Sequence, residues 1–119
     1  ANYIPARICA ILIPVASFLC GCGFTRSLRI AFRDGRKHES LNSGIPEAAM
    51  AGALRVQLGG PSIYHGEVVE KPFIGDDQNQ LTVKSIDIAI KIMYVTSLLF
   101  LICGSGLVIF LKYCNYSVL

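Results

Sequence analysis

Two long stretches without a charged residue, 8–25 and 92–111, lie on either side of a polar central segment. A helix of about 20 apolar residues is long enough to cross the ~30 Å hydrocarbon core of a bilayer. Charged residues make up only 16% of the chain, whereas soluble domains average about 25%. The sequence therefore predicts an all-α integral membrane fold, in which two transmembrane helices flank a loop that faces the cytoplasm.

The ends of these parts are marked by glycines and by a capping residue. Gly21 and Gly23 favour an end to the first apolar helix, and Thr82 is a good N-cap for the last one. The chain is then expected to divide into a transmembrane helix (1–25), a cytoplasmic substrate loop (26–82), a second transmembrane helix (83–113) and a tail (114–119).

Within the loop, arginines at helical spacing are expected to extend the first helix as far as the Asp34-Gly35 break. A short helix is predicted over 46–58, because proline suits a helix start and the pair Gly59-Gly60 suits its end. Its side chains are small, so this helix can lie very close to other helices or to a ligand. Residues 61–75 are expected to be irregular.

Positive charges gather where the loop meets the two apolar stretches, which predicts the orientation of the chain. Because cytoplasmic loops carry an excess of lysine and arginine, the loop should be cytoplasmic in a multi-pass protein of the cell membrane. A signal peptide would carry basic residues before its apolar run, and here they follow it. No basic stripe with interleaved aromatic residues indicates a nucleic-acid partner. The cations are Arg26, Arg29, Arg33, Arg36 and Lys37 after the first stretch, and Lys84 and Lys91 before the second.

The five cysteines give no disulfide framework, because their number is odd and most of them lie within the apolar stretches. Cys20 and Cys22 could form half of a metal site, but no second pair stands at ligand spacing. Small hydrophobic residues of a membrane helix are the simpler interpretation.

The loop contains groups that suit a phosphorylated substrate. Phosphate is bound by guanidinium groups and by free backbone N–H groups, which Arg33, Arg55 and the pair Gly59-Gly60 could supply. Asp76 and Asp77 could hold Mg²⁺ beside phosphates. Neither a Walker A motif nor a dinucleotide fingerprint is present. The loop histidines, His38 and His65, suit either proton transfer or ordinary surface hydrogen bonding.

Several loop segments together resemble the adenosylcobinamide-phosphate synthase family. They are RDGRKHES (33–40), LNSG (41–44), PEAAMAGAL (46–54), LGGPS (58–62), YHGE (64–67) and VEKP (69–72). The resemblance implies a membrane enzyme of cobalamin biosynthesis that joins a carboxylate of adenosylcobyric acid to the amine of aminopropanol or of its phosphate. It implies ATP and Mg²⁺ as cofactors, with ATP activating the carboxylate, most simply as an acyl phosphate. The lipid bilayer and further transmembrane helices would be partners, and this chain would be the C-terminal portion of a longer protein.

Roles for individual residues are hypotheses that follow from this resemblance. Asp34, His38 and Glu47 are the predicted catalytic residues, with His38 as the group that transfers a proton. Asp76 and Asp77 are the predicted metal ligands. The predicted substrate-binding residues are Arg33, Asn42, Arg55, Gly59, Gly60, Tyr64, Gly66, Lys71 and Gly75.

The chain also departs from the family pattern at a few positions. Leu41 stands where proline is usual and Ile45 where tryptophan is usual, and Arg-Val-Gln at 55–57 replaces the common Gly-Val-Arg. The second function class is a non-enzymatic membrane scaffold with two spans, or a transporter subunit. Transporters place polar residues inside their spans, and the few hydroxyl groups in these two stretches argue against transport.

Overall fold

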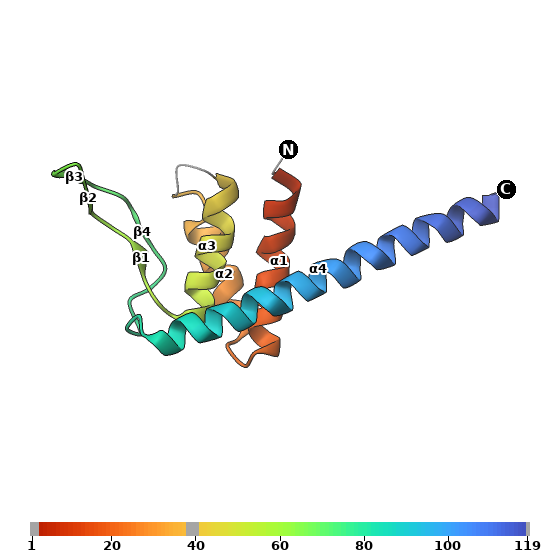
Figure 1. Ribbon diagram of the computed structural model, residues 1–119, viewed down its shortest axis with the longest axis horizontal. Coiled ribbons are helices and arrows are strands. Elements are labelled where there is room, and N and C mark those ends of the chain that lie inside the picture. Colours follow the sequence, from red (N-terminus) through yellow and green to blue (C-terminus); the bar gives the residue numbers. More distant parts are fainter. Residues whose placement is uncertain (1–2, 38–40, 119) are drawn as a thin grey trace.

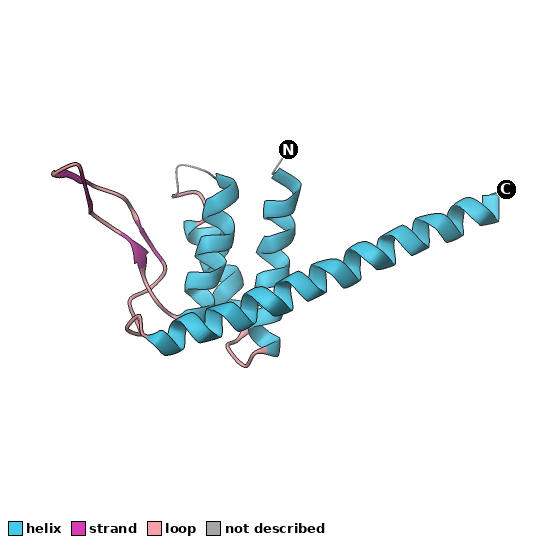
Figure 2. Cartoon of the chain, viewed as in Figure 1, coloured by secondary structure: helices cyan, strands magenta, loops and turns pink. Residues whose placement is uncertain are grey.

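The fold is mostly helical, with a narrow β-ribbon between the third and the fourth helix (Figures 1 and 2). The structure is a computed structural model, and it describes residues 3–37 and 41–118. The prediction of an all-α fold is therefore corrected by the ribbon. The elements are α1 (Tyr3–Leu19), α2 (Phe24–Asp34), α3 (Leu41–Leu54), β1 (Leu58–Gly59), β2 (Ser62–Tyr64), β3 (Glu67–Val69), β4 (Phe73–Ile74) and α4 (Val83–Val118).

The first helix ends where the glycines predicted an end, and the chain then reverses. Gly21 and Gly23 both have positive φ angles, 83° and 96°, which glycine adopts without the strain that a side chain would add. The hydroxyl of Ser17 donates a hydrogen bond to the carbonyl of Gly23 at 2.8 Å and fixes the turn. The arginine-rich segment is consequently a separate helix, α2, and not the expected continuation of α1.

Helices α2 and α3 pack very closely because α3 presents small side chains. Ala49 is fully buried, and its carbonyl accepts a 2.7 Å hydrogen bond from the buried hydroxyl of Ser27. A methyl group added at Gly52 would lie 2.9 Å from the Cβ of Ile30, which is closer than two packed carbon atoms approach. The predicted close packing is confirmed, although α3 begins at Leu41 and contains Pro46 instead of starting there.

The ribbon occupies the segment that was expected to be irregular. Its outer part is a hairpin in which β2 pairs antiparallel with β3, and its base is the pairing of β1 with β4. His65 and Gly66 connect the hairpin with positive φ angles of 51° and 80°, as a two-residue type I′ turn requires. The β-branched residues Ile63, Val68 and Val69 favour strands, but strands of three residues show no clear alternation, and this explains why the prediction failed.

Helix α4 begins at the predicted capping residue and crosses the lower end of the bundle (Figure 1). The N–H of Ser85 donates to the Thr82 hydroxyl at 3.4 Å, and the N–H of Thr82 donates to the Ser85 hydroxyl at 3.3 Å. This reciprocal pair is a capping box with serine in the place of the usual glutamate. Buried Ile92 then joins the core, where side chains of all four described helices meet.

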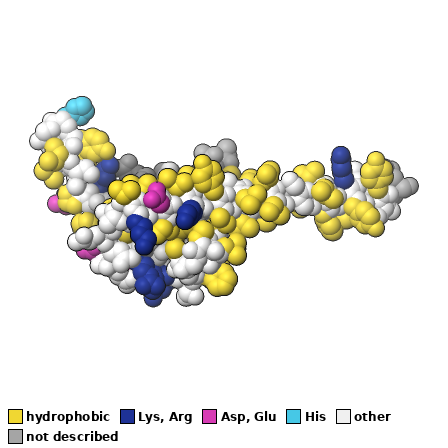
Figure 3. All heavy atoms as spheres, turned by 60° about the horizontal axis from the view of Figure 1, so that its bottom comes forward, with side chains coloured by type: hydrophobic (Ala, Val, Ile, Leu, Met, Phe, Trp, Pro, Cys, Tyr) yellow, Lys and Arg dark blue, Asp and Glu magenta, His cyan; other side chains and the backbone are white. Residues whose placement is uncertain are grey.

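Beyond the core, α4 extends away from the bundle with exposed apolar side chains, which Figure 3 shows along its length. It continues to Val118 instead of ending at 113. Among the described residues, it alone is long and apolar enough to cross a membrane, which indicates membrane association. The apolar part of α1 is shorter, covering 4–19. Two spans around a cytoplasmic loop, and the multi-pass topology, therefore stay predictions.

Candidate functional site

Asp34, the last residue of α2, ties the ribbon to the helices. Its side chain is fully buried, and its Oδ2 accepts a 2.8 Å hydrogen bond from the N–H of Gly75, which directly follows β4. Arg33 donates to both carboxylate oxygens, from Nε to Oδ1 at 2.9 Å and from Nη2 to Oδ2 at 2.8 Å. Lys37 Nζ lies 3.0 Å from Oδ1. One buried carboxylate thus joins the end of α2 to the base of the ribbon.

These contacts hold Asp34 in its ionised form. The hydrogen bonds from Arg33 lower the pKa of Asp34 far below its usual value, against the opposing effect of burial, and the Gly75 N–H and Lys37 act in the same direction. Hydrogen bonds to Asp34 and Asp76 in turn raise the pKa of Arg33. A carboxylate held in this way is poorly suited to accept a proton near neutral pH. The geometry therefore favours an anchoring role for Asp34 over the predicted catalytic one.

Gly75 fits this anchor because it has no side chain. Its φ angle is 89°, and a Cβ at this position would collide with the carbonyl oxygen of Val56 and lie 2.9 Å from the Cβ of Ala51. Its N–H is committed to Asp34. The predicted substrate-binding residue therefore serves the packing of the ribbon base against α3.

Next to the anchor, the ribbon and the helices enclose a cavity of about 270 Å³, which we call the ribbon cleft. Glu47 of α3 and Lys37, which follows α2, line it from the helical side. Ser62, Glu70 and Lys71 line it from the ribbon. Small-molecule sites usually measure ~300–1,000 Å³ and combine apolar surface with a few polar groups. The ribbon cleft can therefore hold the reacting end of a larger ligand between two cations and two carboxylates.

Lys71 is held in place on the ribbon by Tyr64 from the opposite arm. Its Nζ donates a 3.2 Å hydrogen bond to the Tyr64 hydroxyl and lies 4.8 Å from the centre of the Tyr64 ring. A cation over an aromatic ring at this distance is attracted by the ring's negative face. The two predicted substrate-binding residues, Tyr64 and Lys71, are thus brought together, and Gly66 lies in the turn beyond them.

The structure unites only part of the predicted site. Glu47, Gly59 and Lys71 line the ribbon cleft. Asn42 lies in the first turn of α3 and is not among the residues that line it. The N–H of Gly60 donates to the carbonyl of Pro72 at 3.3 Å, so it is not available for phosphate as expected. His38 lies outside the described residues.

Three polar lining residues, Lys37, Ser62 and Glu70, were not predicted as site residues from the sequence. Lys37 stands three positions after Asp34, a spacing at which side chains on a helical turn meet, and this signal was available. Ser62 and Glu70 reach the cleft through the pairing of β2 with β3, which the sequence reasoning did not identify.

The two predicted metal ligands, Asp76 and Asp77, have different surroundings. Asp76 Oδ1 lies 2.9 Å from Arg33 Nη2, whereas Asp77 is exposed. Within residues 3–37 and 41–118, no group of three or more His, Cys, Asp or Glu residues could hold a metal ion. Mg²⁺ in phosphate sites often uses only one or two carboxylates together with substrate oxygens. The Mg²⁺ site stays a prediction, with Asp77 as its less committed carboxylate.

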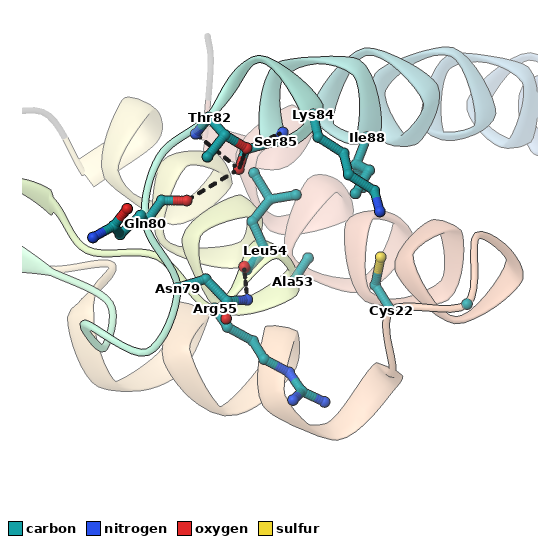
Figure 4. A pocket seen from close by; sticks show the side chains of 11 residues that line it. Cys22, Ala53, Leu54, Arg55, Asn79, Gln80, Thr82, Lys84, Ser85 and Ile88 are labelled. Atoms are coloured by element: carbon teal, nitrogen blue, oxygen red, sulfur yellow. Dashed lines mark hydrogen bonds between the residues drawn. The ribbon is translucent and has the colours of Figure 1, made fainter.

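Arg55 lies apart from the ribbon cleft, at a second cavity of about 380 Å³ (Figure 4). It directly follows α3 with a φ angle of 59°, and the next N–H, that of Val56, donates to the carbonyl of Ala51 at 3.1 Å. This 6→1 bond is that of a Schellman motif, in which the left-handed position is usually glycine. The geometry explains why glycine is common at position 55 in the pattern that the sequence resembles.

Comparisons with known proteins give similarity over most of the chain. A family model described as CobD/Cbib protein matches residues 1–93. The cobalamin biosynthesis protein CbiB of Salmonella typhimurium is 48% identical over 99 residues, which are 83% of this chain and 31% of that protein. The cobalamin biosynthesis protein CobD of Geobacter metallireducens is 49% identical over 94 residues, 79% of this chain and 30% of that protein. CobD of Photorhabdus laumondii is 42% identical over 102 residues, 86% of this chain and 32% of that protein.

The chain thus spans about a third of the length of the curated relatives that it matches. No solved structure matches it.

Proposed function

Because this chain belongs to the CobD/CbiB protein family, we propose that it takes part in cobalamin biosynthesis as part of a membrane-associated enzyme. The proposed reaction is the ATP-dependent ligation of a carboxylate of adenosylcobyric acid to the amine of aminopropanol or of its phosphate. The observation that supports it is the ribbon cleft, where Lys37, Glu47, Glu70 and Lys71 line one opening. Both reacting groups of such a ligation are charged in water, and the cleft offers partners of both signs.

Amide formation has two chemical requirements. One oxygen of the carboxylate must become a leaving group, and ATP, when bound, would supply the phosphoryl group for this. The amine must attack as a neutral nucleophile, so a base has to take its proton. The C–N bond forms as the phosphate leaves with the electrons of the C–O bond, and the proton passes to the base.

The lining side chains match these requirements. Glu47, on the helical side, is proposed to contact the ammonium group and to accept its proton. Lys37 and Lys71, from the two sides of the cleft, are proposed to bind the oxygens of the carboxylate and its phosphoryl group, since ammonium groups make strong charge-assisted hydrogen bonds to such oxygens. Asp34 keeps the ribbon, and with it Lys71, in position. His38 stays a second candidate for proton transfer.

The substitution Glu47→Gln tests this assignment. The amide has nearly the same shape as the carboxylate but does not accept the proton, so the rate of amide formation is expected to fall by about 100-fold. The measurement is the conversion of adenosylcobyric acid and aminopropanol phosphate by membranes that contain the full-length protein, followed by chromatography and with the protein level checked by immunoblot.

The matched control is Glu67→Gln, an exposed glutamate of β3 that does not line the cleft, and it is expected to keep the wild-type rate. A Glu47→Gln protein that works at the wild-type rate would remove Glu47 from the mechanism. If the unchanged protein forms no amide with ATP present, the ligase proposal itself is wrong, and the membrane scaffold becomes the better interpretation.

A further inference from the structure

The cavity next to Arg55, which we call the α4-base cavity, lies where three parts of the bundle meet. The turn between α1 and α2, the end of α3 and the first turn of α4 all line it. In Figure 4, Lys84 extends from the start of α4 toward Cys22, and Arg55 extends from the end of α3 in the direction of the α1–α2 turn. The volume of the α4-base cavity, about 380 Å³, lies within the range of small-molecule sites.

The charge at this cavity is positive only. Arg55 and Lys84 line it, and neither aspartate nor glutamate is among its lining residues. Within the part of the chain that the structure describes, neither cation has a carboxylate partner within 4 Å, because the ion pairs found there belong to Arg33 and Lys37. By contrast, the ribbon cleft contains charges of both signs. An anionic ligand would therefore find two cations here without displacing an existing partner.

Neutral polar groups complete the lining. Thr82 and Ser85 bring hydroxyl groups, and Asn79 brings an amide whose Nδ2 already donates to the carbonyl of Leu54 at 3.2 Å. Lys84 stands in the first turn of α4, where the helix dipole adds further positive potential. A guanidinium fork, an ammonium group and hydroxyl donors are the groups that bind phosphoryl oxygens.

The backbone at Arg55 gives a second, independent observation. Its carbonyl accepts hydrogen bonds from the N–H groups of Gln78 at 3.3 Å and Asn79 at 2.8 Å, which fix a left-handed conformation that a side chain adopts only with strain. A glycine would adopt this conformation freely. Strained residues gather at functional sites because the surrounding structure can hold them there. An arginine at this strained position, where glycine would fit freely, therefore indicates that the positive charge of Arg55 has a function.

We propose that the α4-base cavity binds a phosphoryl group through Arg55 and Lys84. The group can belong to a soluble phosphate compound or to a lipid headgroup, since the cavity lies at the start of the apolar helix α4. The chemistry is the same for both sources. This proposal concerns binding alone and does not depend on the ligase reaction.

Cys22 serves as a reporter because it lines the cavity and is a free thiol. The full-length protein in neutral detergent is treated with N-ethylmaleimide, and the modification rate of Cys22 is followed by peptide mass spectrometry. Inorganic phosphate is added in one series and a short-chain phosphatidylglycerol in the other, with chloride at equal ionic strength as the reference. A bound phosphoryl group is expected to slow the modification of Cys22 in a saturable way.

The variants show whether the two cations cause this protection. Arg55→Gly removes the charge and suits the left-handed backbone, and Lys84→Gln removes the second charge. Each is expected to raise the half-saturating ligand concentration by about tenfold, as the loss of a charge-assisted hydrogen bond does. Lys91→Gln is the matched control, because Lys91 is an exposed lysine of the same helix outside the cavity lining. Its half-saturating concentration should not change.

Each outcome decides the matter. Protection by inorganic phosphate identifies a soluble phosphate compound as the source, and protection by phosphatidylglycerol alone identifies a lipid headgroup. The proposal is overturned if neither probe slows the modification of Cys22. It is equally overturned if Arg55→Gly and Lys84→Gln proteins, with unchanged melting temperatures, are protected like the wild type.

Discussion

The substitution Asp34→Asn is expected to lower the free energy of unfolding by about 3 kcal/mol. The buried carboxylate has Arg33, Lys37 and the N–H of Gly75 as partners, and the amide removes the negative charge that all three share. It also turns an NH₂ group toward at least one donor. This loss of stability lies at the lower end of the range for breaking a buried ion pair, because the side chains of Arg33 and Lys37 are 44% and 46% exposed. Denaturant titration of the full-length protein in detergent measures the change.

Asp76→Asn is the matched control for this experiment. Asp76 binds the same nitrogen of Arg33 at 2.9 Å, but its side chain is one-third exposed, at 33%. Partly exposed ion pairs contribute about 1 kcal/mol or less, so the loss should be clearly smaller than that for Asp34. Equal losses in the two variants would show that burial at Asp34 does not set the strength of the anchor.

The anchor also makes stability depend on acid. In the unfolded chain an aspartate has a pKa of about 3.9, and in the folded protein the pKa of Asp34 is lower, chiefly because of Arg33. Below about pH 4 the unfolded state therefore binds the proton more readily, and stability falls as the pH falls. The unfolding free energy of Asp34→Asn should vary less with pH in this range than that of the wild type. Parallel curves for the two proteins would contradict the assignment.

The substitution Gly75→Ala is also expected to lower the free energy of unfolding by about 3 kcal/mol. The added methyl group meets two penalties, a φ angle of 89° and a collision with the carbonyl oxygen of Val56 beside the Cβ of Ala51. Neither contact can move easily, because one atom is backbone and the other belongs to the buried face of α3. Any shift of Gly75 also lengthens its hydrogen bond to Asp34. The same denaturant titration measures the loss.

Gly66→Ala separates the two penalties. Gly66 has a φ angle of 80°, but a Cβ there would have no neighbour within 4 Å. Gly66→Ala should therefore lower the free energy of unfolding only by the conformational penalty, about 1 kcal/mol. If the two glycine variants lose the same stability, the close approach of the ribbon base to α3 contributes nothing.

The sequence predicted those features that depend on single residues or on long apolar stretches. The end of the first helix follows from the freedom of Gly21 and Gly23, and the start of α4 follows from the capping side chain of Thr82. The close approach of α3 to α2 follows from side chains too small to keep helices apart. In each case a local property was sufficient, so neighbours distant in sequence did not have to be known.

The ribbon and the cleft depend on distant contacts, which explains the errors there. Strands of two or three residues are too short to show a clear alternation, and the β1–β4 pairing joins Leu58 to Ile74 across the whole hairpin. Asp34 was predicted to be catalytic from the family resemblance, and the pair Asp34-Gly35 was predicted only to end the helix. The burial of Asp34 becomes visible only when Gly75, 41 positions away, is placed against it. Glu47, Gly59 and Lys71 were predicted as site residues, but Lys37, Ser62 and Glu70, which line the same cleft, were not.

The two sides of the ribbon cleft differ in how they are held in the fold. Glu47 lies on α3, which packs closely against α2 at Gly52 and through the hydrogen bond from Ser27 to Ala49. Lys71 lies between β3 and β4, in a ribbon that is held at its base by Asp34 and by the β1–β4 pair. A ligand that enters therefore meets one wall of closely packed helices and one wall of short strands that is joined to the helices at its base. We therefore expect the ribbon, and not α3, to shift when ligands of different bulk bind or leave.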